Sequence, residues 1–174
     1  MAPTLGRTTG SGSHMRTAID TSALFALLYP SDTHNERAKE LLGTAARSGA
    51  VVITPPVYTE LAADSGFGSQ DSLDEFLDET GIELSVPTTE TRYTAGQAFR
   101  RYLDRRGDAL QCSVCGTETV FDCPDCGSPV SARRHVPSDF VIGAHAEQEA
   151  DALVTFDAGF FRDYFEVEIR ALTD

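Results

Sequence analysis

The chain has 174 residues, of which 41% are hydrophobic, and it carries a formal net charge of −13 at pH 7. This length allows one domain with a buried core that needs no disulfide bonds. The sequence shows no apolar run of the roughly 20 residues that a transmembrane helix needs, and no signal peptide. We therefore expect a cytoplasmic protein without membrane association.

Acidic residues dominate the charge, with 27 Asp and Glu against 14 Lys and Arg. Lys39 is the only lysine. An acid-rich, lysine-poor sequence that keeps regular apolar spacing resembles an archaeal, halophilic cytosolic protein. The net charge does not exclude a nucleic-acid ligand, because such binding depends on local basic patches.

Apolar spacing, turn residues and helix caps define the expected elements. Residues 1–14 are interpreted as an expression tag or a disordered extension. Thr33 and Glu36 have the spacing of a capping box at the start of a helix. In chain order, the sequence predicts a strand at 16–20, helices at 21–29 and 33–48, a strand at 50–54, helices from Pro56 and at 71–80, a strand at 82–86, helices at 88–106 and 138–148, a strand at 151–156, a helix at 158–165 and a strand at 166–172.

The alternation of strands and helices predicts an α/β fold. We expect three α/β/α layers around a five-stranded, mainly parallel sheet. Residues 107–136 interrupt this pattern, since they hold four cysteines and few apolar residues. We interpret 15–106 and 137–174 as one domain and 107–136 as a small insertion.

Acidic residues follow several of the predicted strands. Asp20 ends the first strand, Asp157 follows a later one, and Glu60 and Asp139 lie in early turns of helices. Ligands of such sheets bind beyond the carboxyl ends of the strands, so we expect these acids to meet there. Converging carboxylates repel one another unless cations neutralise them, and oxygen ligands favour Mg²⁺ or Mn²⁺. Asp151 precedes its strand and is assigned no catalytic role.

Each acid taken alone also has a structural explanation. Asp157 is placed to cap the next helix, and Asp139 is placed to interact with a helix dipole. No Ser–His or Cys–His pair indicates nucleophilic catalysis, and His34 and His145 are interpreted as surface residues.

Short motifs carry a resemblance to PIN domains, particularly the archaeal and bacterial VapC toxins. The segments AIDTSALFALL, TELA, SDFVIGAHA and LVTFDAGF resemble the family motifs in order and spacing, over 16–106 and 137–174. Gly143 stands where these proteins usually have alanine, a change that we expect to be tolerated. The positions matched to the family's functional residues are Asp20 with Ser22, Glu60, Asp139, and Asp157 with Thr155.

The resemblance implies an endoribonuclease that depends on Mg²⁺ or Mn²⁺. Asp20, Asp139 and Asp157 would hold the metal, Glu60 would complete its ligand shell directly or through water, and Ser22 would orient Asp20 or the water. RNA would be the substrate, with a small antitoxin protein and a second copy of the chain as partners. Two alternatives stay open: a PIN/zinc-ribbon endonuclease that processes rRNA, and a non-catalytic RNA-binding protein with a vestigial PIN pocket.

The cysteines form two CxxC pairs, Cys112 with Cys115 and Cys123 with Cys126. Four thiolates at this spacing favour a closed tetrahedral site for structural Zn²⁺, and the segment resembles a zinc ribbon. Metal binding would supply the folding free energy, on the order of 10 kcal/mol. Iron stays open as the metal, and disulfides are not expected in a cytosolic protein. Ordinary VapC toxins lack such an insertion.

Arginines flank the insertion on both sides. Arg101 and Arg105 share a helix face before it, and Arg133 and Arg134 follow it. Arginine is suited to phosphate recognition, so these residues are predicted to bind RNA. Phe121 is a candidate for stacking on a base. The alternative is that the arginines pair with neighbouring acids.

Overall fold

The structure is a computed structural model that describes residues 15–106, 109–111, 117–130 and 138–171. Its main sheet has five strands in the order β3-β2-β1-β8-β9. Every neighbouring pair in this sheet is parallel. The strands are β1 (Met15–Ile19), β2 (Gly49–Ile53), β3 (Ile82–Leu84), β8 (Ala152–Val154) and β9 (Glu168–Arg170).

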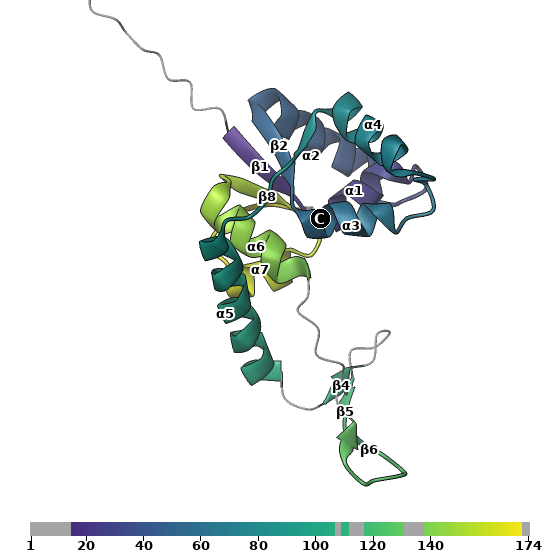
Figure 1. Ribbon diagram of the computed structural model, residues 1–174, viewed down its shortest axis with the longest axis vertical. Coiled ribbons are helices and arrows are strands. Elements are labelled where there is room, and N and C mark those ends of the chain that lie inside the picture. Colours follow the sequence, from purple (N-terminus) through teal and green to yellow (C-terminus); the bar gives the residue numbers. More distant parts are fainter. Residues whose placement is uncertain (1–14, 107–108, 112–116, 131–137, 172–174) are drawn as a thin grey trace, which may run out of the picture.

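Helices cover both faces of this sheet, as Figure 1 shows. The long helices α5 and α6 pack against each other on one side, and α1 and α2 lie on the other. The predicted three-layer α/β/α fold is therefore confirmed. The helices are α1 (Thr21–Leu28), α2 (Asn35–Ser48), α3 (Pro55–Ala62), α4 (Gln70–Thr80), α5 (Thr89–Arg106), α6 (Ser138–Glu149) and α7 (Ala158–Tyr164).

Two small antiparallel hairpins lie between α5 and α6 in the sequence. The first pairs β4 (Leu110–Gln111) with β5 (Glu118–Thr119), and the second pairs β6 (Phe121–Asp122) with β7 (Pro129–Val130). Figure 1 places them beyond the end of α5, away from the main sheet. Each hairpin encloses one CxxC pair in the sequence.

Most predicted elements are found, but β3, β8 and β9 are shorter than predicted. The capping box predicted for α2 is wrong: His34 occupies the N-cap position and its side chain makes no capping hydrogen bond. The reason is tertiary, because Asn35 is buried and donates hydrogen bonds to the carbonyls of Ala26 (2.8 Å) and Leu27 (3.0 Å). These bonds fix the start of α2 against the end of α1.

Gly143 lies on the side of α6 that contacts Phe165. A Cβ atom at Gly143 would lie 2.3 Å from Cε2 of Phe165, which is only 5% exposed. The ring thus fills the space that a side chain would need. Glycine is therefore accommodated at 143, and the packing of Phe165 depends on it.

In the part of the chain that the structure describes, no helix combines the length and the apolar character that crossing a bilayer requires.

Candidate active site

Asp20 directly follows β1, with 5% of its surface exposed. Its Oδ2 accepts hydrogen bonds from the hydroxyls of Ser22 (2.6 Å) and Thr155 (2.8 Å). Its Oδ1 accepts one from the backbone amide of Thr21 at 2.8 Å. Burial is the largest influence on the pKa of Asp20 and raises it; the hydrogen bonds lower it, and the charge of Glu60 raises it.

Glu60 faces Asp20 from α3. Its Oε2 accepts a hydrogen bond from the hydroxyl of Thr21, and its Oε1 accepts one from the hydroxyl of Ser138. Thr21 begins α1, directly after Asp20, and Ser138 begins α6, directly before Asp139. Each oxygen of Glu60 thus accepts a hydrogen bond from a residue that is adjacent in sequence to another site acid, Asp20 or Asp139.

Asp139 and Asp157 complete the group of acids. Asp139 lies in the first turn of α6. Asp157 occupies the N-cap position of α7, but its side chain makes no capping hydrogen bond. Its backbone amide donates to Thr155 Oγ1 at 3.0 Å. Helix capping therefore does not explain why an aspartate stands at 157.

The pKa of Asp139 reports how close the acids are. It is raised to about 6, first by burial and then by the charges of Asp20, Glu60 and Asp157. Repulsion of this kind requires the carboxylates to be near one another in a poorly hydrated environment. The structure thus brings together the four acids that the sequence singled out.

The chemistry of this pocket fits a hard divalent cation. All donors are oxygen atoms, and a cation would relieve the repulsion. Among the described residues, however, no three His, Cys, Asp or Glu side chains are already grouped as ligands of one ion. The oxygens of Asp20 and Glu60 accept hydrogen bonds from hydroxyls instead. An ion bound at these atoms would have to share or displace those bonds.

Thr21 and Ser138 were not singled out from the sequence. Each begins a helix, where a hydroxyl residue is expected simply as a cap. The only sequence signal is that each is adjacent to a predicted site acid. Their interaction with Glu60 is formed across 39 and 78 residues of chain.

The second CxxC pair forms a tight turn in its hairpin. The amide of Cys123 donates to the carbonyl of Ser128, and the amide of Gly127 to the carbonyl of Cys123, each at 2.8 Å. Gly127 has a φ of 68°, a left-handed conformation that favours glycine. The pKa of Cys126 is lowered, first by the hydroxyl of Ser128, then by its amide and by Cys123. Cys112 and Cys115 lie outside the described residues.

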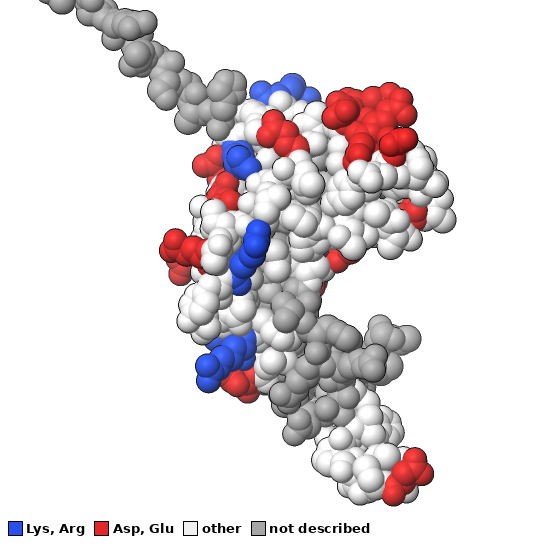
Figure 2. All heavy atoms as spheres, viewed as in Figure 1, with Lys and Arg blue, Asp and Glu red and all other residues white. Residues whose placement is uncertain are grey.

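Two of the four predicted RNA-binding arginines lie in the described part of the chain. Arg101 and Arg105 are exposed near the end of α5, where Figure 2 shows basic side chains. The guanidinium of Arg105 lies 5.6 Å from the centre of the Tyr164 ring, which orients it by a cation–π contact. Arg133 and Arg134 lie outside the described residues.

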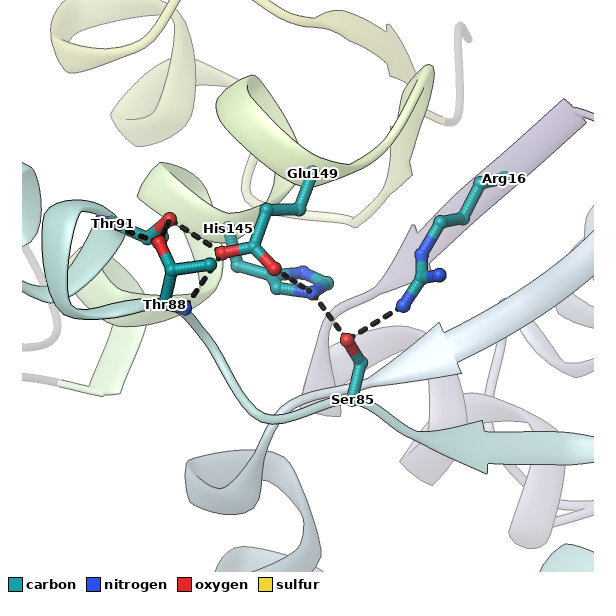
Figure 3. A network of polar contacts seen from close by, with 6 residues as sticks. All are labelled: Arg16, Ser85, Thr88, Thr91, His145 and Glu149. Carbon is teal, nitrogen blue, oxygen red and sulfur yellow. Dashed lines mark hydrogen bonds and ion pairs between the residues drawn. The ribbon is translucent and has the colours of Figure 1, made fainter.

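His145 is not a surface residue, contrary to the expectation, since its side chain is fully buried. Its Nε2 lies 2.8 Å from the hydroxyl of Ser85, which accepts a hydrogen bond of 2.6 Å from Arg16 (Figure 3). The sequence analysis did not identify this buried Ser–His contact. Glu149 approaches the same nitrogen at 3.9 Å, while Nδ1 has no hydrogen-bond partner among the described residues. This arrangement does not form a Ser–His–acid relay, which needs the acid on the other nitrogen.

The cluster around His145 joins distant parts of the fold. Glu149 accepts hydrogen bonds from the amide of Thr88 (2.9 Å) and the hydroxyl of Thr91 (2.5 Å), as Figure 3 shows. These contacts tie the end of α6 to the start of α5. Burial is the main cause that lowers the pKa of His145, so its imidazole is neutral near pH 7.

Two solved structures share the fold of this chain. One is VapBC2 from Rickettsia felis bound to a DNA fragment from its promoter, with 18% identity, a TM-score of 0.57, and coverage of 90% of this chain and 98% of that one. The other is VapBC-1 from nontypeable Haemophilus influenzae, with 14% identity, a TM-score of 0.56 and the same coverage of 90% and 98%. No curated protein matches the sequence.

Residues 17–119 match the PIN domain family. The matched segment includes Asp20 and Glu60, and Asp139 and Asp157 follow it in the chain. In the structure, Asp20 directly follows β1, and Asp157 lies beyond the carboxyl end of β8. The chain belongs to the PIN domain family.

Proposed function

We propose that this protein is a VapC-like endoribonuclease that depends on Mg²⁺ or Mn²⁺. The observation that carries the proposal is the meeting of Asp20, Glu60, Asp139 and Asp157 in one site, where burial, and then the charges of the other three acids, raise the pKa of Asp139 to about 6. A stable fold gains nothing from such repulsion, so a cationic ligand is the simplest reason for it.

Asp20, Asp139 and Asp157 would hold the metal, and Glu60 adds a fourth negative charge to the pocket. The metal supplies the positive charge that activates water and stabilises the phosphate in the transition state. Ser22 and Thr155 donate to one oxygen of Asp20 and fix the plane of its carboxylate. The Phe156 amide in turn donates to Ser22 Oγ at 3.2 Å, which holds this hydroxyl in place.

The insertion would bind structural Zn²⁺ through all four cysteines. Two hairpins with one CxxC pair each, and the lowered pKa of Cys126, support a site for thiolates. Metal analysis of the native protein tests this, with one zinc per chain as the expected result. A chain without zinc or iron would contradict it.

RNA would approach along the side that carries the hairpins. Arg101, Arg105, Arg133 and Arg134 would contact phosphates, and the exposed side chain of Phe121 would stack on a base. The similarity to VapBC structures supports a small antitoxin as a partner, and an adjacent small gene would favour this role over rRNA processing.

A cleavage assay with a mixed RNA pool tests the proposed function. The full chain should cleave RNA in the presence of Mn²⁺, and cleavage should stop when EDTA is added. The double variant Asp20→Asn/Asp139→Asn should be inactive. Binding of RNA without cleavage would favour the non-catalytic alternative. Cleavage that survives in the double variant would refute the enzyme proposal.

A further inference from the structure

The carboxylate of Glu60 connects the starts of two helices. One of its oxygens accepts a hydrogen bond from the hydroxyl of Thr21 and the other from the hydroxyl of Ser138. The Thr21 side chain is buried, with 6% of the residue exposed. Hydrogen bonds to an ionised group in such a setting are among the stronger ones in proteins.

The two hydroxyls occupy equivalent places beside the metal-binding aspartates. Thr21 is joined by a peptide bond to Asp20 at the start of α1, and Ser138 is joined in the same way to Asp139 at the start of α6. Glu60 therefore links the first residues of two helices that carry one site aspartate each. Fixing both helix starts to one carboxylate also fixes the separation of Asp20 and Asp139.

We propose that Glu60 is a positioning residue that acts through Thr21 and Ser138 and holds the starts of α1 and α6 at a fixed separation. This inference rests on the proposed function and assigns roles within the same pocket. Thr21 and Ser138 become part of the site, although neither is expected to touch the metal or the RNA.

Two outcomes are possible for the hydroxyls. If Glu60 acts as a clamp, meaning that it holds the starts of α1 and α6 through Thr21 and Ser138, removing either hydroxyl frees one helix start and weakens metal binding, because the ion must then order that helix start. If these contacts do not position the site, removing the hydroxyls leaves metal binding unchanged, or strengthens it by freeing the oxygens of Glu60. The direction of the change in metal affinity therefore tests the clamp.

The test is calorimetric titration of the full chain with Mn²⁺ in the absence of RNA. Binding that remains in Asp20→Asn/Asp139→Asn is subtracted, because an acidic surface also binds cations weakly. We expect Thr21→Val and Ser138→Ala each to weaken Mn²⁺ binding by roughly tenfold, the effect of one hydrogen bond to a charged group. Ser138→Thr keeps a hydroxyl and should bind nearly as the wild type does.

Thr91→Val is the matched control. Thr91 is also buried, and its hydroxyl also donates to a glutamate, Glu149, at 2.5 Å. This bond lies in the cluster of Figure 3, and Glu149 is at the opposite end of α6 from Asp139. Thr91→Val should therefore lower the melting temperature without changing Mn²⁺ affinity.

Unchanged or tighter Mn²⁺ binding by Thr21→Val and Ser138→Ala would overturn the clamp while leaving the proposed nuclease intact. An equal loss of Mn²⁺ affinity in Thr91→Val would also overturn the clamp, since the weaker binding would then reflect a general loss of stability. A wild-type chain that binds no Mn²⁺ above the double variant would contradict the proposed function and this inference together.

Discussion

The ionised form of Asp139 lowers the stability of the fold. Its pKa of about 6 means that the folded chain holds a proton there at a higher pH than the unfolded chain, whose value is near 3.8. Ionisation above pH 6 therefore costs folding free energy, and this cost disappears as the pH falls towards 3.8. A bound cation offsets the same cost.

Asp139→Asn should stabilise the metal-free protein while abolishing cleavage. Because Asp139 is only half-buried, solvent screens the effect, and we expect about 1 kcal/mol at pH 7.5. That corresponds to a rise of about 2–4 °C in melting temperature for a domain of this size. Thermal melting in EDTA measures it, and the rise should be smaller at pH 5. A lower melting temperature at pH 7.5 would show that the carboxylate is not under repulsion.

For His145 we predict a dependence of folding stability on pH of the opposite sign. Its folded pKa lies below 6.5, so the unfolded chain binds this proton first, and stability falls as the pH drops below about 6.5. His145→Gln keeps an acceptor for Ser85 but cannot titrate. Urea unfolding at pH 7.5 and 5.5 should show a smaller loss on acidification for His145→Gln than for the wild type. Equal losses of stability in the two proteins would show that His145 does not cause the loss on acidification.

Among the elements, α6 explains why sequence reasoning succeeded in one place and failed in another. Asp139 was predictable, because its place at the start of a helix beside parallel strands follows from topology. His145 was not, because α6 is buried on nearly all sides, with five consecutive buried residues from 142 to 146. An argument from one polar and one apolar face does not hold for such a helix.

Gly143 and Gly96 provide a paired test of helix packing. Gly143→Ala forces Phe165 to move and should destabilise the fold by about 1–3 kcal/mol. Gly96 in α5 has nothing within 4 Å of an added Cβ, so Gly96→Ala should stabilise it by roughly 0.4–1 kcal/mol. Urea denaturation measures both. If Gly143→Ala also stabilises the protein, the Phe165 contact does not hold this helix in place.

The molecule as a whole consists of a packed α/β body and a segment with little core of its own. The parallel sheet and the convergence of the acids could be inferred from the alternation of strands and helices, because parallel strands end at a common edge. The hydroxyls on Glu60 and the cluster at His145 could not, since they depend on long-range contacts. The cysteine pattern predicts a metal site, but two of its four cysteines lie outside the described residues.

Removing the cysteine-bound metal should unfold the insertion before the sheet. The exposed side chains of Val120, Phe121 and Val130 show that the hairpins bury few apolar groups, so metal binding has to hold them. Hydrogen exchange with and without a zinc chelator measures this. Amides of 117–130 should lose protection while those of β1 and β2 keep it, and RNA binding should weaken. Simultaneous loss across the sheet would contradict an independent insertion.

The four acids are proposed to form a metal-dependent nuclease site. The most direct test compares the rates at which the wild type, Asp20→Asn and Asp151→Asn cleave RNA at one Mn²⁺ concentration. Asp151 lies at the opposite edge of the sheet, where it accepts a hydrogen bond from the Arg16 amide at 2.7 Å, and asparagine keeps that acceptor. Asp20→Asn should lose on the order of a hundredfold or more in rate, and Asp151→Asn should cleave like the wild type. Equal rates for all three proteins would place the activity outside this pocket.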